Sequence, residues 1–212
     1  MTLVLVDLDG TLLDRKGSEV SFALSLLGRR ILGPKQIVAY LVFYMRWTWR
    51  FGCAVAQKNK AYLSGLCYED VARLGAQFAH QHLLPQVRPT LLGKLESHRR
   101  LGCHRVLLTG SPDFLAIPLA EILGIEHVRA TRCAQRDGCF TAEPPLIHPF
   151  GVEKLHVAQE VAKKLNADLS DCIAYADSWD DLPLLLSVSH PVVVMPNAVL
   201  QRLSRRRGWG VF

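Results

Sequence analysis

The cysteines of this chain form no C-x-x-C pair, although 6 of them occur among its 212 residues. Paired cysteines at that spacing are typical of structural zinc sites and redox motifs, so the sequence indicates neither type of site. Cys172 lies in an apolar run that has the pattern of a buried strand. We therefore expect free, buried thiols in a reducing compartment.

A basic leader with a cleavage site is also missing, because the first residues run directly into the apolar stretch at positions 3–6. This pattern argues against a signal peptide and predicts a cytoplasmic location. The apolar run at 37–45 is interrupted by Arg46 and Arg50, well short of the roughly 18 to 20 residues of a spanning helix. We expect a buried or half-buried helix there. An interfacial helix, with Trp and Arg at the head-group level of a membrane, is the alternative.

Low-complexity segments and internal repeats are absent, and half of the residues are hydrophobic, which excludes a disordered chain. The net charge of +6 suits an anionic ligand. Part of that charge lies in clusters such as 205–207, which are usually only solvated. Because no nucleic-acid-binding motif accompanies the charge, we expect no nucleic-acid partner.

Short apolar runs alternate with helical patterns along much of the chain. Strands are predicted at 3–6, 106–109, 127–130, 172–176 and 191–195, the last closing the set, with a turn at 110–112 and a small hairpin around 136–138. Helices are predicted at 114–123, 151–165 and 182–186. This alternation predicts an α/β fold, with a Rossmann-like parallel sheet and helices on both faces.

The segment between the first two strands is helical from about 18 to 92, which is too long for a simple crossover. We expect it to form an inserted α-helical cap. The predicted division is residues 1–14 and 89–212 for the catalytic core and residues 15–88 for the cap domain.

Acidic residues follow two of the predicted strands. Asp7 and Asp9 come after the first strand, and Asp177 and Asp181 follow a later one. Ligands of open α/β sheets bind at the carboxyl ends of the strands, so these residues should meet at one edge together with Thr109, Gly110 and Lys154. Carboxylates crowded in this way repel one another unless a cation lies between them, and oxygen ligands beside a phosphate suit Mg²⁺.

Each of these residues also has an ordinary explanation. The D-x-D-G-T segment could be a turn, although a calcium-binding EF-hand loop would require glycine where Leu12 stands. Lys154 could be a solvated helix lysine, Thr109 a strand-end hydroxyl, and Asp177, Asp180 and Asp181 helix caps. The order and placement of all of them together favour a shared site.

Four segments, in this order, resemble the motifs of the haloacid dehalogenase superfamily: 7–11 (DLDGT), 107–111 (LLTGS), Lys154 and 175–181 (YADSWDD). The resemblance covers the whole chain and is nearest to the phosphoserine-phosphatase-like branch, whose helical cap follows the first motif. It implies Asp7 as nucleophile and Asp9 as general acid and base. It also implies Thr109, Gly110 and Lys154 as phosphate ligands, and Mg²⁺ held by Asp7, the Asp9 carbonyl, Asp177 and Asp181.

The resemblance has two departures. Ala176 replaces a usual glycine, and Lys16 occupies the position of the glutamate with which phosphoserine phosphatases read the substrate amine, while Glu19 is out of register. The resemblance implies a phosphatase of a small phosphorylated metabolite, such as histidinol phosphate or phosphoserine. Alternatives are a phosphatase of a lipid head group such as phosphatidylglycerol phosphate, with peripheral membrane contact, a phosphotransferase, and a non-catalytic phosphate-binding regulator.

Overall fold

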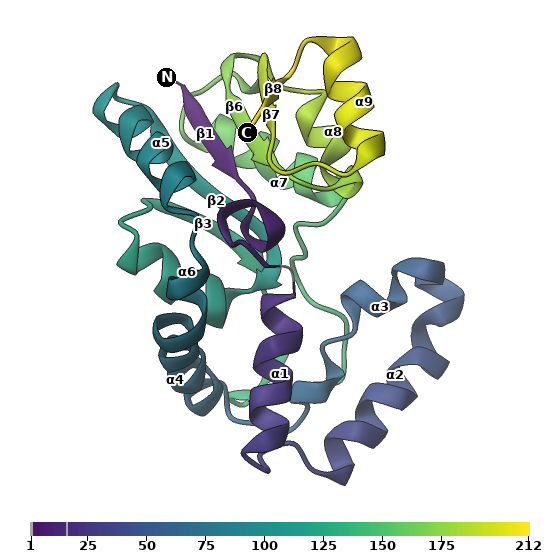
Figure 1. Ribbon diagram of the computed structural model, residues 1–212. Coiled ribbons are helices and arrows are strands. Elements are labelled where there is room, and N and C mark those ends of the chain that lie inside the picture. The colour runs from purple at the N-terminus through teal and green to yellow at the C-terminus, as the bar shows by residue number, and fades with distance from the viewer. Residues whose placement is uncertain (1, 16) are drawn as a thin grey trace.

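A parallel sheet of six strands forms the centre of the computed structural model, which describes residues 2–15 and 17–212 (Figure 1). Lys16 therefore lies outside the described residues. The strand order is β3-β2-β1-β6-β7-β8, and every neighbouring pair is parallel. The strands are β1 (Leu3–Val6), β2 (His104–Pro112), β3 (His127–Thr131), β6 (Ile173–Ala176), β7 (His190–Val193) and β8 (Gly210–Val211). The predicted α/β sheet is confirmed.

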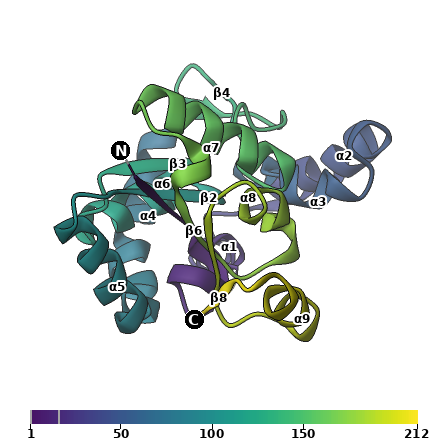
Figure 2. The ribbon, with the colours of Figure 1, turned by 90° about the horizontal axis from the view of Figure 1, so that it is seen from above.

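Both faces of β1 are buried, which explains why the strand reads as an unbroken apolar run. Val4 and Val6 belong to one hydrophobic cluster, while Leu3 and Leu5 belong to another on the opposite face. Helices α5 and α6 contribute to the first cluster and helices α7 and α8 to the second. Figure 2 shows α5 and α7 on opposite sides of the strands. These helices, with the last one, are α5 (Pro89–Arg100), α6 (Asp113–Ile122), α7 (Val152–Lys164), α8 (Leu182–Leu185) and α9 (Ala198–Arg207).

Besides α5, four α-helices of the described residues lie between β1 and β2 in the sequence, as the long helical pattern predicts. They are α1 (Ser18–Gly28), α2 (Pro34–Phe51), α3 (Val55–Lys58) and α4 (Tyr68–Phe78). Helices α2 and α3 project away from the sheet, whereas α4 lies beside α6 (Figure 1). Short helical turns complete the set: η1 (Leu8–Leu12), η2 (Gly52–Ala54), η3 (Ala61–Leu63), η4 (Ala79–Leu83), η5 (Leu84–Gln86), η6 (Leu169–Asp171) and η7 (Trp179–Asp181).

The two segments that connect the inserted helices to the sheet run side by side. Leu13 and Val87 form an antiparallel bridge, and the Asp14 N–H donates to the Gln86 carbonyl at 2.8 Å. The Arg88 N–H donates to the Leu12 carbonyl at 2.9 Å. These contacts bring the predicted boundaries at 14/15 and 88/89 together, and the division into a core and a cap domain stays a prediction.

The structure corrects several sequence predictions. Residues 110–112, predicted as a turn, continue β2, with a register irregularity against β3 between Leu108 and Pro112. The strand predicted at 191–195 does not close the set, because α9 and β8 follow it. The predicted hairpin is confirmed as β4 (Gln135–Arg136) and β5 (Cys139–Phe140). Asp137 and Gly138 turn between them with φ values of 52° and 76°, as a tight hairpin requires.

Helix α2 is more exposed than expected. Phe43 is the buried residue among its described positions, while Met45 and Trp49 are 76% and 81% exposed. The prediction of a buried or half-buried helix is therefore wrong for most of its surface. Only one face packs on Val55 and Ala61, through Phe43 and the partly buried side chains Ala39, Tyr44, Trp47 and Phe51. Among the described residues, each helix is too short or too polar to cross a membrane.

The six cysteines are free, as expected. Cys133 and Cys172 are buried, whereas Cys53 is exposed and Cys67, Cys103 and Cys139 are partly exposed. The expectation that the thiols would be buried therefore holds for two of them.

Candidate active site

Asp7 and Asp177 lie together because their strands are neighbours. Asp7 follows β1 directly, and its N–H donates to the Tyr175 carbonyl of β6 at 3.0 Å, which continues the pairing of the two strands. Asp177 follows β6 directly. Since both strands are parallel and in register, their carboxyl ends deliver both side chains to the same edge of the sheet.

Three buried carboxylates gather at this edge. Asp7, Asp177 and Asp181 each offer an oxygen atom, and these atoms all lie within 4.8 Å of one another. The Thr11 hydroxyl donates to Asp177 at 3.3 Å, and the Ser178 hydroxyl donates to Asp181 at 3.1 Å. A set of carboxylate oxygens without sulfur or imidazole suits a hard divalent cation. The described residues therefore fit a metal of this kind.

Lys154 supplies the positive charge of the site. It lies in the first turn of α7, is 2% exposed, and donates from Nζ to Asp7 Oδ1 and to Asp181 Oδ1, each at 2.6 Å. The sequence placed this lysine near the two carboxylates, and the structure brings the three side chains together. One ammonium thus bridges two buried carboxylates, which a lysine on the solvent face of a helix would not do.

Burial and charge act in opposite directions on the ionisation of this cluster. Burial raises the pKa of the Asp7 carboxyl, the Lys154 ammonium opposes that shift, and the charges of Asp181 and Asp177 add to it, so the net pKa is raised. Burial alone would lower the pKa of Lys154, but Asp181 and Asp7 outweigh it and the net pKa is raised. A bound divalent cation would add positive charge beside Asp7 and favour its anionic form.

Asp9 points toward the inserted helices. Its carboxylate accepts hydrogen bonds from the N–H and the hydroxyl of Ser18, at 2.7 and 2.8 Å, and from the hydroxyl of Ser111. Ser18 is the first residue of α1, so a carboxylate here also meets the positive end of that helix. Asp9 is thus fixed at the junction of sheet and inserted segment, and its side chain is separate from the three-carboxylate cluster. The predicted metal contact through its backbone carbonyl stays a prediction.

Thr109 and Gly110 lie in the carboxyl-terminal part of β2. The Thr109 hydroxyl is buried and accepts a hydrogen bond from the Ser111 N–H at 3.0 Å. The Gly110 carbonyl accepts from the Thr131 hydroxyl at 2.6 Å. Both residues line a cavity of about 300 Å³ together with Asp7, Asp9, Lys154, Asp177 and Asp181. The structure therefore brings every predicted site residue to one cavity.

His148 also lines this cavity and was missed by the sequence analysis. The Thr131 hydroxyl has a single hydrogen, which goes to the Gly110 carbonyl, so the 2.8 Å contact with His148 Nδ1 requires that nitrogen to donate. Burial lowers the pKa of His148 to about 3, with Lys60 and Lys58 adding to the shift, so the ring is neutral. His148 thereby positions the strand end that carries Gly110.

Other lining residues were also missed. They are Ser111, which holds Asp9, and Glu19 and Lys60, which belong to the inserted segment. Ser18, which also holds Asp9, was missed as well. Ser111 stands in the T-G-S segment and Glu19 was noted in the sequence, so these two had a signal. Lys60 and His148 had none, because neither falls at a strand end or in a recognisable motif.

Comparisons with known proteins agree with this geometry. The family model of haloacid dehalogenase-like hydrolases matches residues 4–186. The chain belongs to this family. The match includes every predicted site residue, and the predicted superfamily and the hydrolase class are confirmed.

Relatives and solved structures extend the similarity to nearly the whole chain. The chain is 30% identical to the inhibition of morphological differentiation protein of Streptomyces azureus and to a Mycobacterium tuberculosis protein named "probable phosphatase", over 99% of this chain and 77% and 74% of theirs. A histidinol-phosphatase of Neisseria meningitidis is 24% identical over 99% of this chain and 97% of its own.

Among solved structures, a Bordetella pertussis protein of unknown function has a TM-score of 0.82, with 24% identity over 100% of this chain and 99% of its own. A phosphoserine phosphatase, solved as a phospho-aspartyl intermediate analogue, has a TM-score of 0.59 at 17% identity, over 95% of this chain and 90% of its own. These two structures support the fold.

Proposed function

We propose that the protein is a Mg²⁺-dependent phosphatase that hydrolyses a small phosphomonoester through an aspartyl-phosphate intermediate. The observation that carries the proposal is the buried cluster of Asp7, Asp177 and Asp181, with Lys154 bridging two of the three carboxylates at 2.6 Å. Membership of the hydrolase family and relatives named as phosphatases support it.

In the proposed reaction, a carboxylate oxygen of Asp7 attacks phosphorus and displaces the alcohol of the substrate. Asp9, two residues further along, donates a proton to the departing oxygen, and it later accepts a proton from the water that hydrolyses the acyl phosphate. Lys154 and the Thr109 hydroxyl hold phosphoryl oxygens, as does the backbone N–H of Gly110. A Mg²⁺ ion held by Asp7, Asp177 and Asp181, with the Asp9 carbonyl, would neutralise charge on the phosphoryl group.

Asp9 suits this role because of where it is held. Three donors from Ser18 and Ser111 fix its carboxylate in the wall of the cavity, between the sheet and the inserted helices. A leaving alcohol that extends from Asp7 toward the inserted helices would pass this position. A hydrolase needs such a base to activate water, and the phosphotransferase alternative differs only in using a second alcohol as acceptor.

The experiment is a panel of phosphorylated metabolites, including histidinol phosphate and phosphoserine, assayed for phosphate release with Mg²⁺ and with EDTA. We expect release that EDTA abolishes and that added Mg²⁺ restores. Release that continues unchanged after the metal has been removed would reject the metal-dependent mechanism. Added acceptor alcohols would yield a new phosphorylated product only from a phosphotransferase, and a non-catalytic regulator would bind phosphate without releasing product.

The second candidate is a phosphatase of a lipid head group at a membrane surface. It is favoured by the exposed apolar side chains of α2, including Leu41, Met45 and Trp49, next to Arg46 and Arg50. Both arginines lie over the Trp47 ring, at 5.1 and 5.6 Å from its centroid. Aromatic and basic residues of this kind suit the head-group region of a bilayer. Co-sedimentation with anionic vesicles tests it, since an enzyme for a soluble substrate stays in the supernatant.

A further inference from the structure

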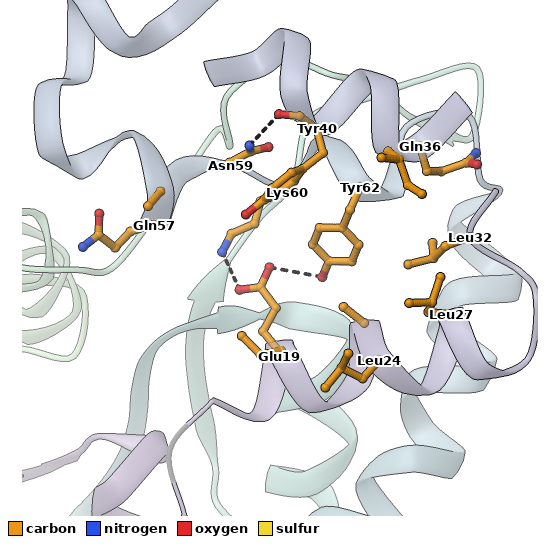
Figure 3. A pocket seen from close by; sticks show the side chains of 14 residues that line it. Glu19, Leu24, Leu27, Leu32, Gln36, Tyr40, Gln57, Asn59, Lys60 and Tyr62 are labelled. Atoms are coloured by element: carbon orange, nitrogen blue, oxygen red, sulfur yellow. Dashed lines mark hydrogen bonds and ion pairs between the residues drawn. The ribbon is translucent and has the colours of Figure 1, made fainter. Parts of the chain in front are cut away.

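A second cavity adjoins the catalytic one. It has a volume of about 600 Å³ and lies within the inserted segment, between α1 and α2 (Figure 3). Four residues line both cavities: Glu19, Val20, Gln57 and Lys60. A phosphomonoester whose phosphoryl group lies at Asp7 must extend its alcohol portion away from the carboxylates. We call this second cavity the cap cavity. Because it shares a wall with the catalytic cavity, it provides the adjoining space for the alcohol portion of the substrate.

The walls of the cap cavity are largely apolar. Side chains of α1 and α2 supply most of its lining, together with the segment between them: Val20, Ala23, Leu24, Leu27, Leu32 and Ile37. Val20 and Leu24 are 63% and 62% exposed although they face a concave surface. A concave apolar surface next to a reactive site is the usual form of a small-molecule binding site. A ligand that covers this surface is stabilised, because the apolar surface is removed from water.

Two side-chain amides in the same wall already have protein partners. The Gln36 side chain donates to the Ser64 carbonyl and accepts from the Gly33 N–H, both at 3.0 Å. The Asn59 side chain donates to the Tyr40 carbonyl at 2.9 Å and accepts from the Ala61 N–H at 3.1 Å. Figure 3 shows the contact between Asn59 and Tyr40. These amides support the backbone of the cap cavity, and their bonds leave them poorly placed to recognise a polar ligand.

The charged residues of the cap cavity compensate each other. Among its described lining residues these are Glu19 and Lys60, whose side chains form an ion pair, and Lys60 is 5% exposed. The Tyr62 hydroxyl donates to the other Glu19 oxygen at 3.1 Å (Figure 3). Burial raises the pKa of Tyr62 well above its usual value, with the charge of Glu19 adding to the shift, so the phenol stays neutral. Because the two charges offset each other, this pair gives the cap cavity little preference for a substrate ammonium or carboxylate.

We infer that the substrate is a phosphomonoester of an alcohol that carries an extended apolar chain, and that this chain lies in the cap cavity. The inference rests on the proposed phosphatase function and adds the class of the leaving group. The phosphoryl group would lie at Asp7, and the chain would pass the Glu19–Lys60 pair to reach Leu24 and Leu27. A phosphorylated amino acid such as phosphoserine would leave the apolar wall uncovered.

The test is a series of n-alkyl phosphates from ethyl to decyl, assayed with Mg²⁺ at concentrations at which they remain monomeric. Burying one methylene group stabilises a complex enough to raise its binding constant by up to about fourfold. We therefore expect kcat/KM to rise with chain length, by up to about fourfold per methylene, until the cavity is filled. Equal values along the series overturn the inference.

Two leucine variants test whether the apolar chain of the substrate lies in the cap cavity or on the exposed surface of α2. Leu24 lines the cavity and Leu41 does not, yet the two are similarly exposed, at 62% and 57%. We expect Leu24→Ser to reduce the ratio of kcat/KM for decyl phosphate to that for ethyl phosphate by about tenfold, the cost of losing most of one apolar side-chain contact. Leu41→Ser should leave this ratio unchanged. Leu27→Ser, with thermal unfolding as a check, serves if Leu24→Ser fails to fold.

The outcomes distinguish the two levels of the proposal. An equal loss in Leu24→Ser and Leu41→Ser would place the chain outside the cap cavity and overturn the inference. Hydrolysis of other phosphomonoesters without hydrolysis of any alkyl phosphate would also overturn it, while the phosphatase function would stand. Failure to hydrolyse any phosphomonoester would overturn the proposed function as well.

Discussion

The catalytic cavity and the cap cavity share a wall but differ in the side chains that line them and in how exposed those side chains are. In the catalytic cavity, ionisable side chains are buried and held by short contacts, as Lys154 is between Asp7 and Asp181. In the cap cavity, apolar side chains such as Leu24 are exposed, and the amides of Gln36 and Asn59 are bonded to the protein itself. In the proposed function, the first arrangement would carry out the reaction, and the second would select the substrate by shape and apolar contact.

This difference separates the effects of mutations. A change in the catalytic cavity should alter the rate for every substrate by a similar factor, because the phosphoryl group is common to all. A change in the cap cavity should alter the ranking of substrates. The following predictions test that separation, from the largest expected effect to the smallest.

Replacing Asp7 by Asn should have the largest effect. The amide cannot form the aspartyl-phosphate intermediate, so we expect phosphate release to fall to near background, a loss on the order of 10⁵-fold or more, as when nucleophiles of other enzymes are removed. The loss should be the same for short-chain and long-chain substrates. Steady-state assays of phosphate release measure it, and circular dichroism checks folding. Substantial residual activity would reject Asp7 as the nucleophile.

Asp9→Asn should have a smaller effect on the same assay. General acid and base catalysis contributes about 10²- to 10⁴-fold, and we expect a rate reduction in that range. Rapid-quench measurements should show that phosphate leaves the enzyme more slowly than in the wild type, because the base that activates water is missing. A normal rate of phosphate release would show that Asp9 acts only by tying β2 to α1 through Ser111 and Ser18.

Lys154→Ala should affect stability as well as binding. Removing the ammonium leaves Asp7 and Asp181 buried without their partner, and breaking a buried pair in this way costs about 3 to 5 kcal/mol of unfolding free energy. Added Mg²⁺ should recover part of the loss, since it supplies the missing charge. Denaturant unfolding with and without Mg²⁺ measures both effects, and binding of fluoroaluminate should weaken.

The matched control for Lys154→Ala is Lys163→Ala, which removes an exposed lysine from the same helix. We expect the unfolding free energy to change by less than about 0.5 kcal/mol for this surface position. If both variants unfold alike, or if fluoroaluminate binds to Lys154→Ala as to the wild type, the role assigned to Lys154 is wrong.

The smallest effect concerns the contact between the inserted segment and the core. A methyl group at Gly75 of α4 would lie 2.4 Å from the Phe114 carbonyl oxygen of α6, so Gly75→Ala should force these helices apart. Overpacking of this kind costs about 1 to 3 kcal/mol. At Gly93 of α5 a methyl group has open space, so Gly93→Ala should stabilise the protein by up to about 1 kcal/mol. Thermal unfolding compares the two, and equal shifts would contradict the close contact.

Much of the core could be predicted because its strands are buried on both faces. An unbroken apolar run such as Leu3–Val6, ending at an acidic residue, can be recognised without knowledge of its neighbours. The end of β2 could not, because Gly110 and Pro112 are typical turn residues and only pairing with β3 keeps them extended. Helix α2 was predicted as more buried than it is, since an apolar sequence does not specify which element covers it.

The sequence by itself determined that Asp7, Asp177 and Asp181 meet at one edge of the sheet, because these acidic residues follow strands whose parallel order brings their ends together. The haloacid dehalogenase-like family membership follows from the same residues. Only the tertiary structure decided how the inserted helices enclose the cap cavity and that Glu19 is paired with Lys60, 41 residues away. Contacts between helices depend on how their faces pack, and no local pattern encodes which side chain meets which across that distance.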